Sequence, residues 1–373
     1  MSERLQENQV AVIGGEGNMG KVTVELFQSL GYQAISSDTK NPDSINTSDA
    51  ISSSKIVFFS VLPVEEIARI IAEAEDVFTP EHIVLDNASV KNPLIDTYKK
   101  LEAKGVSICS THPLCKHDQP LHGQKALILD VGNNSQQAAE IAERLYRNAG
   151  MVTIPLSFED HDRTMTVVQL VPHLIMRSIG TALEKSGVDM QKLREIAPAN
   201  FQLFNLSMWR TLVQDPRISA TLISNLANSE EGQLLAERIE SAIADILATK
   251  GQDELAGIFE QAYLGLNQGG IGQTMNEATT TVLERLANLD VKSMTVEVKG
   301  DRSGLLREIL LPFEEQRMSL TAIDSHKSKD GIRFELGIDE TTATPESIMA
   351  IVTALQKMGC SVTEISSNNA AEH

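Results

Sequence analysis

The sequence of 373 residues predicts three domains: a doubly wound α/β domain over residues 1–156, an all-helical domain over 157–290 and a small βαββαβ domain over 291–373. Strand-like and helix-like segments alternate in the first part, which is typical of a sheet covered by helices on both faces. Helical spacing then continues without a convincing strand. The last part returns to alternating strand patterns separated by two helical segments, the order of a compact ferredoxin-like unit.

A glycine-rich stretch near the N-terminus predicts a strand, a tight turn and a helix in succession. Residues 10–20 read VAVIGGEGNMG, and helical spacing follows over residues 21–30. In dinucleotide-binding folds such glycines form the turn, let the backbone approach a pyrophosphate and let helix and strand pack closely. The stretch therefore predicts a Rossmann-like domain, with an ordinary glycine turn in an α/β sheet as the alternative. The predicted cofactor contacts are Gly15, Gly17, Asn18, Met19 and Gly20.

The next two predicted strands add candidate cofactor contacts. Residues 31–38 end at Asp38, and a carboxylate at this position accepts hydrogen bonds from the ribose of NAD and repels the 2′-phosphate of NADP. The alternatives are a turn aspartate before Thr39, or a phosphate contact from Lys40. Residues 54–62 form an apolar run typical of a strand buried on both faces. Ser60 and Leu62, at its end, are also predicted to contact the cofactor, which we expect to be NAD.

Two polar residues follow later predicted strands, at the positions where ligands of open α/β sheets bind. Ser89 comes after residues 83–86 and is a candidate catalytic residue, whose hydroxyl is able to bond a substrate hydroxyl or to orient His112 and the nicotinamide. A serine that only caps a helix is the alternative. His112 comes after residues 106–110, and a histidine has the near-neutral pKa that a general base needs. A loop histidine without a catalytic role is the alternative. Further strands are predicted at residues 125–129 and 152–154.

The predicted helical domain contains a candidate anion-binding residue. Arg210 falls in an apolar stretch, residues 203–213, where a guanidinium is costly unless it is paired. Its partner is either a substrate carboxylate or an acidic side chain such as Asp215 or Glu195. A glycine-rich loop is expected at residues 267–273. The predicted helices span residues 160–187, 190–196, 201–214, 218–247 and 254–266.

Composition limits the class of protein. The net charge of −19 argues against nucleic acid or an anionic membrane as a partner. There is no apolar run long enough to span a bilayer, and the polar start does not resemble a signal peptide, so we expect a cytoplasmic protein. The cysteines Cys109, Cys115 and Cys360 have no metal-ligand spacing, so reduced thiols and no metal site are expected.

Several short motifs, taken together over residues 10 to about 270, resemble the prephenate dehydrogenase family. Besides the glycine loop, they are Ala88-Ser89-Val90-Lys91-Asn92, His112-Pro113, Glu159-Asp-His161-Asp162-Arg163-x-Met165, Gln169-x-x-x-His173 and Trp209-Arg210-x-x-x-Gln214-Asp215. The resemblance implies NAD-dependent oxidative decarboxylation of prephenate to 4-hydroxyphenylpyruvate, for tyrosine synthesis. Arogenate, or both compounds, is the alternative substrate. A catalytically weak sensor of an amino acid or of redox state is a more distant one.

The resemblance also assigns residues and an assembly. It implies that His112 is the catalytic histidine and that Arg210 binds substrate, with His173 near substrate or in the core. We assign His161, Asp162 and Arg163 to packing between domains. The helical domain implies a homodimer. The chain departs from the family at Leu114-Cys115-Lys116-His117, where relatives commonly have Met-Phe-Gly-Pro, and Lys116 becomes a candidate substrate contact.

The C-terminal unit resembles an ACT domain, a module that binds amino acids. The resemblance rests on Asp301-Arg302-Ser303-Gly304-Leu305, which precedes a predicted helix within the βαββαβ pattern. It implies a regulatory site that includes Asp301, Arg302 and Gly304, with tyrosine, the end product of the pathway, as the expected effector. The alternative is a module that only adds dimer contacts.

Overall fold

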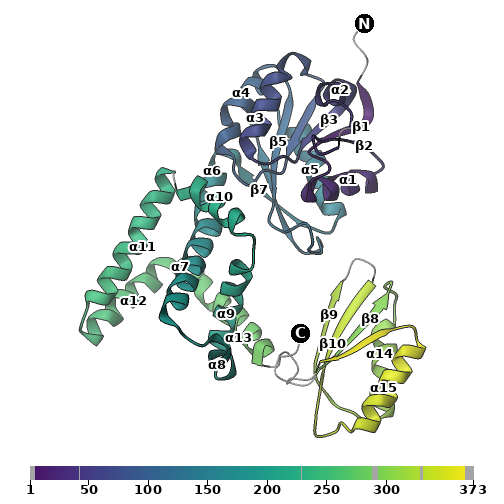
Figure 1. Ribbon diagram of the computed structural model, residues 1–373, viewed down its shortest axis with the longest axis vertical. Coiled ribbons are helices and arrows are strands. Elements are labelled where there is room, and N and C mark those ends of the chain that lie inside the picture. Colours follow the sequence, from purple (N-terminus) through teal and green to yellow (C-terminus); the bar gives the residue numbers. More distant parts are fainter. Residues whose placement is uncertain (1–4, 42, 228, 288–292, 328–330, 366–373) are drawn as a thin grey trace. The chain divides into compact units, whose positions relative to one another are not determined.

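The computed structural model describes residues 5–41, 43–227, 229–287, 293–327 and 331–365 (Figure 1). The chain forms two compact units, one made of Met1–Pro172 and Thr221–Gln233 and the other of His173–Ala220 and Leu234–His373. The boundary expected at residues 290–291 lies outside the described residues.

The first unit contains a seven-stranded sheet with the strand order β2-β1-β3-β4-β5-β6-β7. Neighbouring strands from β2 to β5 are parallel, as expected for a doubly wound sheet. Because β2 and β3 flank β1 on opposite sides, the order of strands reverses at β1, and ligands of such sheets bind at this point. The strands are β1 (Gln6–Ile13), β2 (Gln33–Ser37), β3 (Ser54–Phe59), β4 (Ile83–Asp86), β5 (Ser107–Pro113), β6 (Lys125–Asp130) and β7 (Val152–Ser157).

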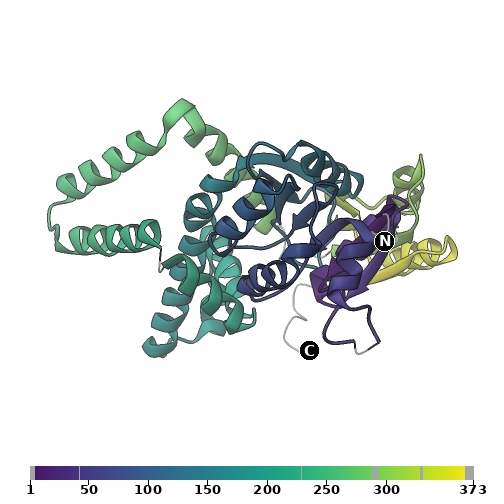
Figure 2. The same cartoon turned by 90° about the horizontal axis from the view of Figure 1, so that it is seen from above.

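Helices cover both faces of this sheet, seen in Figure 1 and from above in Figure 2. Alternate residues of β1 enter different cores: Val10 and Val12 pack with α1 and α5, whereas Ala11 and Ile13 pack with α2, α3 and α4. Central strands are therefore apolar on both faces, as their sequences predict. The helices are α1 (Asn18–Ser29), α2 (Thr47–Ser53), α3 (Val64–Glu73), α4 (Ile95–Ala103) and α5 (Gln136–Asn148), with short turns η1 (Glu75–Val77) and η2 (Asn92–Leu94).

The sixth strand reverses direction. β6 pairs antiparallel with β5, with His112 opposite Leu127, and β7 then runs parallel to β6. The connection over residues 114–124 contains no helix. A parallel crossover takes about a dozen or more residues and usually a helix, so this loop can only return the chain antiparallel.

Helices occupy most of the chain between β7 and residue 287. The helix expected over 160–187 contains a π-helical turn, η3 (Thr166–Leu170), between α6 (Phe158–Met165) and α7 (Val171–Ser186). The helix expected over 218–247 is divided into two, and the glycine-rich loop shrinks to a single turn, η4 (Gln268–Gly270), because α13 begins at Ile271. The remaining helices are α8 (Met190–Glu195), α9 (Ala199–Leu212), α10 (Pro216–Ala227), α11 (Glu230–Ala248), α12 (Gln252–Leu266) and α13 (Ile271–Ala287).

The C-terminal elements follow the expected order βαββαβ. Their sheet is antiparallel with the order β11-β8-β10-β9, and both helices lie on one face of it (Figure 1). Side chains such as Ile309, Ile351 and Leu336 form the core between helices and sheet. The elements are β8 (Ser293–Lys299), α14 (Leu305–Glu315), β9 (Leu320–Lys327), β10 (Gly331–Ile338), α15 (Pro345–Lys357) and β11 (Ser361–Ile365).

Candidate functional site

The glycine loop joins β1 to α1 in the shape that a dinucleotide requires. Gly14 has a φ of 82°, and a Cβ on Gly20 would lie 2.1 Å from the Gly14 carbonyl oxygen. Gly17 caps α1 without a side-chain hydrogen bond, so the first N–H groups of the helix remain available to a phosphate. The left-handed residue is therefore Gly14, one position before the glycines that the sequence pattern singles out. Asn18, Met19 and Gly20 form the first turn of α1.

Asp38 lies just beyond β2 and is held against the glycine loop. Its Oδ2 accepts a hydrogen bond of 3.0 Å from the Glu16 N–H, and its Oδ1 accepts one of 2.8 Å from the Lys40 N–H. Asp38 thus belongs to the turn before Thr39 and also contacts the glycine loop. Its place in a turn is therefore compatible with the predicted contact to the ribose of NAD. Of the two residues after β3, Ser60 accepts a 3.1 Å hydrogen bond from Asn87 Nδ2, and Leu62 is 80% exposed.

His112 lies near the end of β5 and is buried, with 4% of its surface exposed. Its Nδ1 is 2.9 Å from Nε2 of His161, and its Nε2 is 3.4 Å from Nε2 of Gln169. Burial, with the nearby Lys91 ammonium and His161, lowers the pKa of His112 well below the ordinary histidine value. The imidazole is therefore neutral at pH 7, the state in which it can accept a proton.

His161 and Asp162, in α6, extend the contacts of His112 inward. His161 Nδ1 is 2.6 Å from Asp162 Oδ1, and the Asp162 carboxylate also accepts the backbone N–H groups of Lys91 and Asn92. Sequence reasoning assigned His161 and Asp162 to packing between domains and did not connect them to His112. The available signal was the buried stripe of α6, Phe158, His161, Asp162 and Met165, because polar groups on such a stripe must be bonded inside the protein.

Lys91 is also buried, and the sequence analysis quoted it only as part of a motif, without a role of its own. Its ammonium is 2.9 Å from Asp86 Oδ1 and donates to the carbonyl oxygens of Ala88 and Thr111. Burial lowers the pKa of Lys91, and Asp86 opposes that shift. All three N–H donors of the ammonium are used. Lys91 therefore links Asp86, at the end of β4, and Ala88, next to Ser89, to Thr111, which precedes His112.

Ser89 and Lys116 are exposed on loops of the same unit. Ser89 does not cap a helix, because helical structure resumes only at Asn92. Lys116 follows β5 in the 114–124 loop, and its backbone N–H donates to Gln119 Oε1. Neither side chain has an ion pair or hydrogen bond among the described residues, so both are available to a ligand.

His173 is half-buried in α7 of the second unit. Its Nδ1 is 3.1 Å from Ser219 Oγ, and Arg177, one helical turn later, donates to the same hydroxyl. Arg177 also donates to the carbonyl oxygens of Leu212 and Gln214 at the C-terminal end of α9, a favourable place for a cation. Sequence reasoning did not identify Arg177.

Arg210, on α9, is exposed rather than buried. The argument that its apolar surroundings force it to pair is therefore wrong, since water solvates the guanidinium. Asp215, one of the partners considered, instead forms an ion pair of 2.6 Å with Arg217. Among the described residues Arg210 has no ion pair, which leaves it free to bind a carboxylate.

The residues expected to bind an effector lie at the start of α14. Gly304 caps the helix with a left-handed φ of 86°, and Asp301 is exposed. Arg302 makes two hydrogen bonds of 2.6 Å to the Glu308 carboxylate, which raise the pKa of Arg302 and lower that of Glu308.

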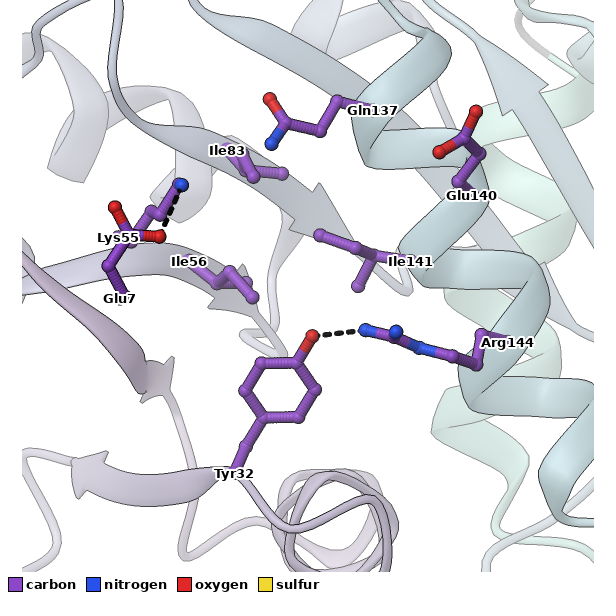
Figure 3. Close-up of a pocket in the computed structure, with 9 residues that line it drawn as sticks. All are labelled: Glu7, Tyr32, Lys55, Ile56, Ile83, Gln137, Glu140, Ile141 and Arg144. Carbon is purple, nitrogen blue, oxygen red and sulfur yellow. Dashed lines mark hydrogen bonds and ion pairs between the residues drawn. The ribbon is translucent and has the colours of Figure 1, made fainter.

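A pocket of about 260 Å³ lies elsewhere on the first unit (Figure 3). Glu7 and Lys55, near the amino ends of β1 and β3, line it, so it is at the edge of the sheet opposite the glycine loop. Lys55 pairs with Glu7 at 2.7 Å, and Arg144 donates to the Tyr32 hydroxyl (Figure 3). Its two cations already have partners, and we assign it no role.

The described side chains do not include three His, Cys, Asp or Glu residues grouped to hold a metal ion. Among the described helices, none combines the length and the apolar character needed to cross a membrane.

The glycine loop at the reversal point of a doubly wound sheet defines the class: a dinucleotide-binding α/β protein. Comparison with known families is more specific. The model of the prephenate dehydrogenase nucleotide-binding domain matches residues 33–154, and that of the prephenate dehydrogenase dimerization domain matches residues 157–261. The chain belongs to the prephenate dehydrogenase family, with a Rossmann-like nucleotide-binding domain followed by a helical dimerization domain.

Two curated relatives are similar to this chain. A probable arogenate/prephenate dehydrogenase of Methanocaldococcus jannaschii is 23% identical over 228 residues, 57% of this chain and 51% of the relative. The T-protein of Enterobacter agglomerans is 23% identical over 246 residues, 66% of this chain and 63% of the relative. The match thus spans less than two thirds of either relative.

Solved structures share the fold. A prephenate dehydrogenase from A. aeolicus, in complex with hydroxyphenyl propionate and NAD⁺, has a TM-score of 0.54 at 18% identity, over 70% of this chain and 98% of that one. Synechocystis arogenate dehydrogenase has a TM-score of 0.50 at 13% identity, over 69% and 98%.

Proposed function

We propose that this protein is an NAD-dependent dehydrogenase that oxidises and decarboxylates prephenate to 4-hydroxyphenylpyruvate. The observation that carries the proposal is the buried, neutral His112 on the nucleotide-binding sheet of a member of this family. Prephenate carries a ring alcohol opposite a ring carboxylate, so oxidation of the alcohol with loss of CO₂ makes the ring aromatic. The reaction needs a hydride acceptor, a proton acceptor and cations for the carboxylates.

NAD is the cofactor, and when bound it supplies the acceptor for the carbinol hydride. The residues that would hold it are Gly15, Gly17, Asn18, Met19, Gly20, Asp38, Ser60 and Leu62. The glycine loop fits a pyrophosphate because its helix start is uncapped, and Asp38 favours a free ribose hydroxyl over a 2′-phosphate.

His112 moves the proton. Its Nε2 accepts the proton of the ring hydroxyl as the carbinol is oxidised. The bond from the ring to its carboxylate then breaks, CO₂ leaves, and the bonding electrons make the ring aromatic. The ring oxygen takes the proton back from Nε2, so the overall reaction neither consumes nor releases a proton.

The other site residues bind and orient the substrate. Ser89 bonds the ring hydroxyl or the nicotinamide, and Arg210 binds a carboxylate through its planar guanidinium. Lys116 and His173 are further substrate contacts in this proposal. Support comes from the solvent-facing side chains of Ser89, Lys116 and Arg210, which no described residue engages.

Arogenate is the second candidate substrate, because an arogenate dehydrogenase and a probable arogenate/prephenate dehydrogenase are among the relatives. The two compounds differ only in a keto oxygen against an ammonium group. The test is to measure NADH or NADPH formation with each substrate and each of NAD⁺ and NADP⁺. The proposal predicts turnover with NAD⁺ and prephenate, arogenate or both. No turnover in any combination would reject it and leave the sensor as the better interpretation.

For the last part of the chain we propose a regulatory ACT domain that binds tyrosine, within the division 1–156, 157–290 and 291–373. Support comes from the βαββαβ order and from the left-handed Gly304 at the start of α14. Calorimetry of the full chain with L-tyrosine, together with activity measured in its presence, tests the idea. Heat of binding and a change in activity are expected. No heat and no change would exclude tyrosine as the effector.

We also propose a homodimer formed through the helical domain. Support comes from the match to the dimerization domain and from α12, which has no buried residue although Phe259 and Leu266 are among its apolar side chains. Apolar groups of this kind, exposed together on one helix, are typical of an interface between subunits.

A further inference from the structure

The contacts of His112 determine which of its two nitrogens carries the proton. Asp162 is an ionised carboxylate: burial alone would raise its pKa, but hydrogen bonds from His161, Asn92 and Lys91 lower it. A carboxylate only accepts hydrogen bonds, so His161 must donate from Nδ1, which is 2.6 Å from Asp162 Oδ1.

The same reasoning passes from His161 to His112. Burial lowers the pKa of His161, so at pH 7 its ring is neutral and its single N–H is the one that faces Asp162. Its Nε2 must then accept, and the donor 2.9 Å away is Nδ1 of His112. A neutral His112 with its proton on Nδ1 has a lone pair on Nε2. Gln169 Nε2, at 3.4 Å, is the donor that faces it.

We propose that His161 and Asp162 are positioning residues that hold His112 in the Nδ1–H tautomer, so that Nε2 is the atom that accepts the substrate proton. The inference rests on the proposed function for the identity of the proton donor, but the tautomer itself is a property of the unliganded protein. The three side chains are buried, with exposed fractions of 4%, 0% and 8% for His112, His161 and Asp162. Water therefore does not compete for these hydrogen bonds.

Backbone N–H groups fix the orientation of the Asp162 carboxylate. Two backbone N–H groups, those of Lys91 and Asn92, donate to it, so an amide at this position would turn its only oxygen toward them. Its NH₂ group would then donate to Nδ1 of His161. His161 would carry its proton on Nε2 and donate it to Nδ1 of His112, so the direction of both hydrogen bonds would be reversed. His112 would carry its proton on Nε2 and could no longer accept one from substrate.

The test is ¹⁵N NMR of histidine-labelled full-length protein, with His112→Asn used to assign the His112 signals. The expected result is an unprotonated Nε2 and a protonated Nδ1 in the unmodified protein, and the reverse in Asp162→Asn. Loss of the correct tautomer in a hydrolase triad costs about 10⁴-fold in kcat, and general acid–base catalysis contributes about 10²- to 10⁴-fold, so kcat should fall by roughly 10²- to 10⁴-fold. KM and the Kd for NAD⁺ should not change.

Asp160→Asn is the matched control, because it makes the same substitution in the same helix at an exposed residue. It should leave the tautomer and kcat unchanged. A proton on Nε2 of His112 in the unmodified protein would overturn the proposal, as would an unchanged tautomer or kcat in Asp162→Asn. If Asp162→Asn does not fold, the spectrum of the unmodified protein still decides. Failure of the proposed function would appear separately, as no turnover of either substrate by the unmodified protein.

Discussion

Buried polar side chains hold together the segments that carry the candidate catalytic residues. Lys91 binds Asp86 and the carbonyl oxygen of Thr111, and Asp162 binds the backbone of Lys91 as well as His161. Each of these groups is costly to bury alone and is retained because its partners are in place. The orientation of His112 thus depends on buried groups of the first unit and not on exposed side chains.

Activity should persist below the pH at which an ordinary histidine is protonated. The neutral His112 is the competent form, and its pKa is lowered by burial and by the groups that face it, Lys91 and His161. More acid is then needed to protonate it, so kcat/KM should fall only as the pH drops clearly below about 6.5, the usual histidine pKa. A pH profile of kcat/KM checks this. An acidic limb at or above the usual value would contradict it.

Removing the Lys91 ammonium should destabilise the protein strongly. In Lys91→Met the Asp86 carboxylate keeps the Tyr98 hydroxyl but loses its buried cation, so the free energy of unfolding should fall by about 3–5 kcal/mol. Urea unfolding measures the change. Lys55→Met is the control, because Lys55 pairs with an exposed Glu7 and should cost less than about 1 kcal/mol. Equal losses in the two variants would show that the buried pair has no special role.

The expected strand ends agree with the structure for Ser89, which follows β4, but His112 lies inside β5 and not beyond its end, because that strand continues to Pro113. The sequence could not reveal the bond between His112 and His161, which are 49 positions apart, or that between Lys91 and Asp162, 71 apart. Such contacts depend on how α6 packs against the sheet. For Arg210 the sequence predicted a buried setting that the structure does not have. Apolar neighbours along a helix do not establish which face of the helix is buried.

The elements themselves were predicted more completely than their connections. Apolar runs located the strands of the first sheet, and helical spacing over residues 21–30 located α1. The direction of β6 was not predicted, because it depends on the helix-free loop before it and not on a pattern within the strand. The π-helical turn η3, which carries Gln169, gives no periodic signal either.

The turn between β1 and α1 should tolerate no side chain at Gly20. In Gly20→Ala the new Cβ would overlap the Gly14 carbonyl oxygen, and the backbone shift needed should weaken NAD⁺ binding by roughly tenfold or more. Calorimetric titration with NAD⁺ measures the Kd. Gly257→Ala in α12 is the control, because its Cβ would meet no atom within 4 Å. An unchanged Kd in Gly20→Ala would mean that the loop does not hold the cofactor.

At the level of the assembly, the apolar surface of α12 should be covered by a second chain. We expect a particle of twice the 40.7 kDa chain mass in sedimentation equilibrium. A carboxylate in an apolar interface is costly, so Phe259→Glu should shift the particle toward the monomer. Ile45→Glu, an exposed position outside the helical domain, should not. A monomeric unmodified chain, or a dimer unaffected by Phe259→Glu, would contradict this interface.

The net charge of −19 has a consequence for the substrate as well. Prephenate, the proposed substrate, is a dianion that the protein as a whole repels, so the proposal relies on local cations such as Arg210 and Lys116 to bind it. Added salt screens the repulsion, and exposed charges act over about 8–10 Å at ordinary ionic strength.

The most direct test of the account is NADH formation from prephenate, and from arogenate, by the unmodified protein and by His112→Asn. The account predicts NADH with release of CO₂ by the unmodified protein. In His112→Asn the rate should fall by about 10²- to 10⁴-fold while the Kd for NAD⁺ stays the same, because the proton acceptor is lost and the glycine loop is intact. Equal rates in the two proteins, or no NADH from either substrate, would contradict it.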